Sequence, residues 1–236
     1  YSYVQNNPLK FIDPTGRDLY IFGSEADYIV AELERYTGLK LHRDPNTGKV
    51  TIVPGSKRDA KGTSPWFANR LAELIRDHRA KVQINTGRNQ AGVFFDSYMT
   101  SQLDVDDYNE FKKADPKLAA ESLAHVIEEY YWEQIIPYAG TADPGWRPAG
   151  DSRGPQSKLD RFLESHAAAT GFESQVLSDF TGWWEKPVAE NPQPGLPDGS
   201  QVTNLDFSSV TYLIIYQNSN VISITKYERQ KPRKQP

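Results

Sequence analysis

The chain has 236 residues, a formal net charge of −4 and no cysteine. The lack of cysteine excludes disulfides, thiolate metal sites and cysteine nucleophiles, so any metal must be held by histidine and carboxylate side chains. Hydrophobic residues make up 38% of the chain and charged residues 25%, which predicts a folded globular domain. We expect no membrane span and no signal peptide in this sequence, and the negative charge argues against nucleic acid as a partner.

The first seventeen residues contain many turn-forming residues and end in the segment N-N-P-L-K-F-I-D-P-T-G at residues 6–16. This segment resembles the end of the RHS/YD-repeat associated core, where a tyrosine-rich stretch runs into N-N-P-x-x-x-x-D-P-x-G. Pro8, Asp13, Pro14 and Gly16 match that pattern, together with the two asparagines. The next residue is Arg17, where the family usually has leucine.

In the RHS family this motif marks the junction at which the repeat shell ends and a variable effector begins, often with self-cleavage just beyond it. The resemblance therefore implies that residues 1–17 end the core and that residues 18–236 form a C-terminal toxin domain. It also implies an RHS repeat shell in the same polypeptide, a cognate immunity protein, and secretion or delivery into a target cell.

The first half of the toxin domain alternates strand and helix patterns. Residues 18–23 read as a strand, and apolar spacing after Ser24 predicts a helix that ends at Gly38. Residues 39–43 and 49–53 flank D-P-N-T-G, which is typical of a hairpin turn. Ser64-Pro65 predicts the start of a helix that continues to about His78.

The second half begins with two short strands over residues 81–85 and 93–95 and an acidic strand or turn over 103–107. Asp115-Pro116 predicts the start of a long helix to about residue 136. A second helix is predicted over 158–170, extending to 180 if Gly171 does not break it. The long loops 137–157 and 181–199 contain many Pro and Gly residues, and 210–216 with 221–227 predict a C-terminal β-hairpin. We therefore predict an α+β domain with a small mixed or antiparallel sheet and two facing helices.

Two of the four histidines fall on the helices predicted over residues 115–136 and 158–170. His125 and Glu129 are four residues apart, so they lie about 40° apart on one helix face and can bind the same zinc ion. The next helix offers His166, and Glu173 shares its face seven residues later. The alternative is a structural histidine on a half-buried helix, with Glu128 and Glu129 on a solvated face.

The order of elements and the L-A-H-x-x-x-E pattern of the long helix resemble zincin-type metallopeptidase domains that occur as RHS cargo. This resemblance implies a zincin-like fold, a zinc cofactor, a protein substrate, and His125, Glu129 and His166 as metal ligands. Glu173 would be an additional ligand or a partner of a ligand.

The helix departs from the zincin pattern at the second position, where Val126 replaces the glutamate that normally takes a proton from water. In an inverted H-x-x-E-H arrangement the base stands at the position of Glu128, which makes Glu128 the candidate catalytic residue. Three alternatives remain open: a toxin nuclease, an ADP-ribosyltransferase-type effector, and a non-catalytic zincin-like module.

Overall fold

A computed structural model describes residues 18–229, apart from residues 57–59, 78–79, 98–99, 136–157, 183–184, 186–188, 194–195 and 197. The predicted junction segment 1–17 and the predicted loop 137–157 lie outside the described residues.

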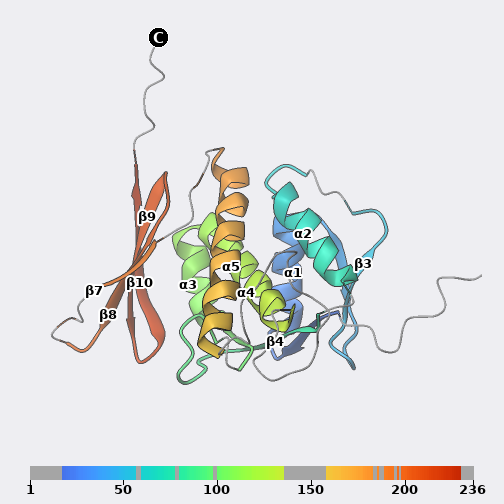
Figure 1. Ribbon diagram of the computed structural model, residues 1–236, viewed down its shortest axis with the longest axis horizontal. Coiled ribbons are helices and arrows are strands. Elements are labelled where there is room, and N and C mark those ends of the chain that lie inside the picture. The colour runs from blue at the N-terminus through green and yellow to red at the C-terminus, as the bar shows by residue number, and fades with distance from the viewer. Residues whose placement is uncertain are drawn as a thin grey trace, which may run out of the picture.

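The described residues form helices and strands that alternate in the first part of the chain, and mainly strands at its end (Figure 1). In chain order the elements are β1 (Leu19–Gly23), α1 (Ala26–Thr37), β2 (Lys40–Arg43), β3 (Val50–Val53), α2 (Pro65–Arg76), β4 (Val82–Gly87), β5 (Asp96–Ser97), β6 (Gln102–Asp104), α3 (Val105–Ala114), α4 (Pro116–Ile135), α5 (Lys158–Thr181), β7 (Ala189–Gln193), β8 (Gln201–Asp206), β9 (Val210–Gln217) and β10 (Asn220–Glu228). This composition confirms the predicted α+β class.

The strands form two four-stranded sheets and one separate hairpin. The first sheet has the order β1-β4-β6-β5 and is mixed, because β1, β4 and β6 run parallel while β5 is antiparallel to β6. The second sheet is antiparallel, has the order β10-β9-β8-β7 and contains the predicted C-terminal hairpin as β9–β10. It lies beside α3, at the opposite end of the helical layer from α2 and β3 (Figure 1).

Two predicted helix boundaries follow from local chemistry. At the start of α2 the Ser64 side chain accepts a hydrogen bond from the Phe67 amide at 3.0 Å, and Pro65 occupies the first turn, where no amide hydrogen is needed. At the end of α1 the backbone of Gly38 has φ 68°, and its amide donates to the Glu34 carbonyl at 2.8 Å. This left-handed conformation is the usual way in which glycine ends a helix.

The prediction for residues 103–107 was incomplete, because β6 ends at Asp104 and α3 begins at the next residue. The Asp104 side chain accepts a hydrogen bond from the Asp106 amide at 2.9 Å and so caps α3. Asp107 is buried and accepts hydrogen bonds from the amides of Phe95 and Val221. The acidic residues that made this segment read as a turn therefore cap the helix and fix neighbouring backbone.

One further boundary confirms the longer of two predicted helix ends, and another differs from the prediction. Helix α5 passes through Gly171 and continues to Thr181, because one interior glycine costs a helix only about 1 kcal/mol. The predicted loop 181–199 contains the short edge strand β7, which pairs with β8. Its sequence Ala-Glu-Asn-Pro-Gln has no strand-type alternation, so pairing with β8 outweighs local propensity.

Helix α4 is the centre of the hydrophobic core. Its apolar side chains are buried on every side of the helix rather than along one stripe, as the burial of Leu118, Leu123, Val126, Ile127 and Tyr131 shows. Polar residues on such a helix need partners, because an unpaired polar group in a core is costly. In the described part of the chain, no helix is both long and apolar enough to cross a membrane.

Candidate metal centre

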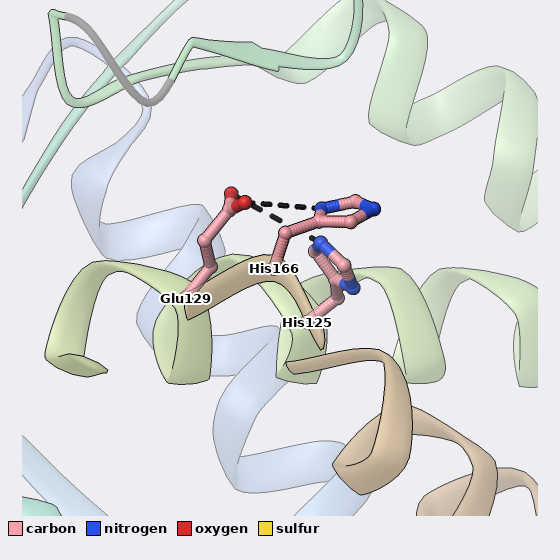
Figure 2. Close-up of side chains that lie close together, drawn as sticks. All are labelled: His125, Glu129 and His166. Carbon is pink, nitrogen blue, oxygen red and sulfur yellow. Dashed lines mark hydrogen bonds and ion pairs between the residues drawn. The ribbon is translucent and has the colours of Figure 1, made fainter. Parts of the chain in front are cut away.

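The two predicted facing helices are α4 and α5, which pack against each other along much of their length (Figure 1). His125 and Glu129 project from α4 toward α5, and His166 projects from α5 toward them (Figure 2). One potential ligand atom from each of these three residues lies within 4.8 Å of the other two. The structure thus brings together the three side chains that the sequence singled out as ligands.

The three side chains have a donor set that can hold a divalent ion. His166 Nδ1 lies 3.1 Å from Glu129 Oε1, and His125 Nε2 lies 4.0 Å from Glu129 Oε2. Two ligand atoms on one tetrahedral zinc are about 3.3 Å apart, so ligand atoms that spread over as much as 4.8 Å would have to move closer together to bind one ion. Two imidazoles and one carboxylate also match the composition of catalytic zinc sites, in which a fourth position stays open.

Glu173 of α5 fixes the ring of His125. Its Oε2 lies 2.5 Å from His125 Nδ1, so the other ring nitrogen, Nε2, faces Glu129. A carboxylate on the far nitrogen is the usual way in which proteins orient a metal-binding histidine and increase its basicity. Glu173, predicted as a ligand or a partner of a ligand, therefore has the position of a partner.

Glu121 extends this chain of contacts deeper into the core. Burial raises the pKa of Glu121 well above its usual range, and the charge of Glu173 and the hydrogen bond between the two carboxyl groups raise it further. Glu121 is hydrogen-bonded to Glu173, and the Ser122 hydroxyl donates to Glu121 Oε2 at 3.0 Å. The sequence contained a signal for this residue, because Glu121, His125 and Glu129 follow one another at four-residue intervals.

Asp96 of β5 is the second acidic group that the sequence interpretation missed. Burial raises the pKa of Asp96 to about 7; the charge of Glu129 raises it too, whereas the charges of His125 and His166 and a hydrogen bond from Tyr130 lower it. The Tyr130 hydroxyl lies 3.2 Å from Asp96 Oδ2. Asp96 is therefore close enough to the three candidate ligands for its charge to interact with theirs.

The surplus of carboxyl groups favours a bound cation. Two histidines are surrounded by Glu129, Glu173, Glu121 and Asp96, and the pKa values of Glu121 and Asp96 are raised. Raised pKa values in neighbouring carboxyl groups are the expected effect of burial and of negative charges that lie close together. A divalent ion between the imidazoles and Glu129 would supply the missing positive charge.

Glu128, the predicted base, does not point at this cluster. Its carboxylate accepts a two-pronged hydrogen bond from Arg70 of α2, with Nε to Oε2 at 2.8 Å and Nη2 to Oε1 at 2.7 Å. The indole nitrogen of Trp132 donates to Oε1 at 2.7 Å as well. One helical residue corresponds to a rotation of about 100°, which turns Glu128 toward α2 while Glu129 faces α5. The geometry therefore does not support Glu128 as the base.

This ion pair predicts that Arg70→Met lowers the free energy of unfolding by about 3 kcal/mol without changing zinc affinity, because the buried Glu128 carboxylate loses its cation. Urea denaturation and calorimetric zinc titration measure the two effects. Glu73→Ala is the matched control, because it removes the exposed partner of the same arginine. We expect that control to stay within about 0.5 kcal/mol of the wild type. A hundredfold loss of zinc affinity in Arg70→Met would instead link Glu128 to the metal centre.

Val126 and His42, also considered from the sequence, do not belong to the three-residue cluster. Val126 is fully buried in the hydrophobic core, so the place of the usual zincin base carries no titratable group. His42 is exposed on β2. His78 lies outside the described residues.

Comparison of the chain with known proteins found no matching family model, no matching curated protein and no matching solved structure.

Proposed function

We propose that residues 18–236 form a zinc-dependent hydrolase of the peptidase class, carried as the toxic C-terminal cargo of an RHS-repeat protein. The observation that carries the proposal is the convergence of His125 and Glu129 on α4 with His166 on α5. A histidine and a glutamate one turn apart on a core helix, faced by a histidine from the next helix, is also the arrangement expected of a zincin-like domain.

Each side chain has a distinct task in this proposal. His125, Glu129 and His166 hold the ion, Glu173 keeps His125 Nε2 directed toward it, and Glu121 in turn holds Glu173. When bound, a zinc ion with one open position lowers the pKa of a water molecule and polarises a substrate carbonyl. His125 is mostly buried and His166 is partly exposed, so a substrate would approach the cluster from the side of His166.

The junction segment supports the assignment to RHS cargo. Its long and unusually spaced pattern, N-N-P followed by D-P-x-G, is the end of the repeat core in that family. This part of the proposal carries with it a repeat shell upstream in the same polypeptide, delivery into a target cell and an immunity protein that neutralises the toxin.

The proposal is tested by zinc titration of the purified wild-type chain, followed by its expression in bacterial cells. We expect one zinc ion per chain, which a chelator removes, and growth arrest accompanied by new protein N-termini. Chains without bound zinc would contradict the metal centre. Degraded nucleic acid or ADP-ribosylated protein, without new N-termini, would favour one of the alternative toxin classes. A zinc-loaded chain that harms no cell would favour the non-catalytic module.

A further inference from the structure

A cavity lies where the C-terminal sheet meets the helical layer. The start of α4, the end of α5 and the strands β9 and β10 contribute to its wall. Its volume is about 230 Å³, which is smaller than the pockets of about 300–1,000 Å³ that hold drug-sized ligands. None of the described residues in its wall belongs to the cluster of His125, Glu129 and His166. The cavity is therefore a separate feature with room for a small molecule.

Several polar groups of the cavity wall already have partners within the chain. The hydroxyls of Thr181 and Ser209 both donate to the buried carboxylate of Glu185. The guanidinium group of Arg229 lies 3.2 Å from Asp206 Oδ1. These groups are engaged within the protein, which leaves the two lysines of the wall as the main candidates to bind a ligand.

Lys226 of β10 is held by one buried and one exposed carboxylate. Its Nζ lies 2.8 Å from Asp115 Oδ2 and 2.7 Å from Glu228 Oε1. The Asp115 side chain is only 7% exposed and also accepts a hydrogen bond from the Tyr212 hydroxyl, so it is fixed in place. The Glu228 side chain is 74% exposed, and ion pairs at such exposure are weak because water screens them. Glu228 is therefore the replaceable partner of Lys226.

Lys117 of α4 is the second lysine of the cavity wall. Its backbone amide donates to Asp115 Oδ1 at 2.9 Å, but within the described part of the chain its ammonium group has neither a hydrogen bond nor an ion pair. The hydrogen bond and charge of Lys226 lower the pKa of Glu228, and the charge of Lys117 lowers it further. The Glu228 carboxylate therefore lies near two cations, one of which has no partner of its own.

We propose that this cavity binds the phosphate or carboxylate group of a small molecule, which displaces Glu228 from Lys226 and is held by Lys226 and Lys117. Glu228 marks the position of the anionic group, because its own carboxylate lies there at ion-pair distance from Lys226. Once Glu228 has moved aside, the two lysines outweigh the charge of Asp115. Ammonium groups form charge-assisted hydrogen bonds with either anionic group. The bound molecule would connect β10 to the first turn of α4.

The test follows the backbone amide signals of the isotope-labelled full chain by NMR, without added zinc, while inorganic phosphate or sodium acetate is added at constant ionic strength. We expect saturable shifts of the signals of Lys117, Ser209 and Lys226, which line the cavity. Tighter binding of phosphate would identify the ligand as a phosphate compound, and tighter binding of acetate would identify it as a carboxylate.

Three variants test the roles of the side chains. Lys117→Met should weaken anion binding about five- to tenfold, because it removes a charge-assisted hydrogen bond. Glu228→Gln should strengthen anion binding about threefold, because it removes the competing carboxylate. Lys113→Met is the matched control, because it removes the same charge from an exposed lysine of α3 that does not line the cavity, and it should bind as the wild type does.

Three results would overturn the anion site. The first is that neither phosphate nor acetate shifts the signals of the cavity wall. The second is that Lys117→Met binds as the wild type does, or that Glu228→Gln binds more weakly. The third is that the shifts centre on His166, which would place the anion at the candidate metal centre instead. None of these results depends on whether the chain is a hydrolase.

Discussion

His125→Ala and His166→Ala should each lower zinc affinity by more than a hundredfold and should abolish growth arrest in bacterial cells. Each variant leaves two donors where the cluster provides three. Loss of a partner that only orients a ligand costs about 10- to 100-fold in metal affinity, and loss of a ligand itself should exceed that range. Titration against a chromogenic zinc chelator measures the affinities, and thermal melting of the metal-free proteins shows whether the variants remain folded.

Two further variants should lose less zinc affinity than His125→Ala and His166→Ala do. Glu173→Gln should fall in the 10- to 100-fold range, because it contacts the far nitrogen of His125 and not the proposed ion. His42→Ala removes an exposed histidine of β2 and should bind zinc as the wild type does. If His125→Ala and His166→Ala also bound zinc as the wild type does, the ion would lie elsewhere and the proposed hydrolase would lose its carrying observation.

The part of the site that could be predicted from the sequence is the part encoded in helical spacing. His125 and Glu129 share a face because they are one turn apart, and Glu128 is turned away by the same arithmetic. The facing residue His166 followed from the next long helix, since helices joined by one connection commonly pack side by side. The α+β class and the C-terminal hairpin followed from periodicity in the same way.

The part that could not be predicted depends on contacts between residues far apart in the chain. Arg70 is 58 residues from Glu128, and no spacing rule connects them. The strained turn at Phe95 is held by Asp107 and by the stacked ring of Phe111, which are 12 and 16 residues further along the chain. Propensity rules assign such a turn to glycine or asparagine, so the sequence alone predicts an ordinary strand at this point.

A large loss of stability is expected on substitution of Asp115, which joins the first turn of α4 to the C-terminal sheet. Its Oδ1 accepts from the Lys117 amide at 2.9 Å, and its Oδ2 contacts the Tyr212 hydroxyl at 2.9 Å and Lys226 Nζ at 2.8 Å. Asp115→Ala should lower the free energy of unfolding by about 3 kcal/mol, because it removes a helix cap, the acceptor of the buried Tyr212 hydroxyl and one of the two carboxylates that pair with Lys226. Urea denaturation at neutral pH measures this loss.

Asp115→Asn separates the cap from the charge. Asparagine keeps an acceptor for the helix amide, so we expect this variant to lose only about 1–2 kcal/mol. Glu228→Gln is the control, because Glu228 is the exposed second partner of Lys226 and should contribute little. If Asp115→Asn lost as much as Asp115→Ala, the pairing with Lys226 would outweigh the cap.

The comparison of wild type with Asp115→Asn also predicts how the free energy of unfolding depends on pH. Burial alone would raise the pKa of Asp115, but hydrogen bonds from Lys226, the Lys117 amide and Tyr212 outweigh it, so the pKa lies below its usual value of 3.8. A depressed pKa means that the ionised form stabilises the fold at neutral pH and that this stabilisation disappears as the pH falls through the lowered pKa. The stability difference between wild type and Asp115→Asn should therefore be constant near pH 7 and shrink in acid.

Because His125 lies ten residues along α4, about 15 Å away, zinc affinity of the folded variant should stay unchanged.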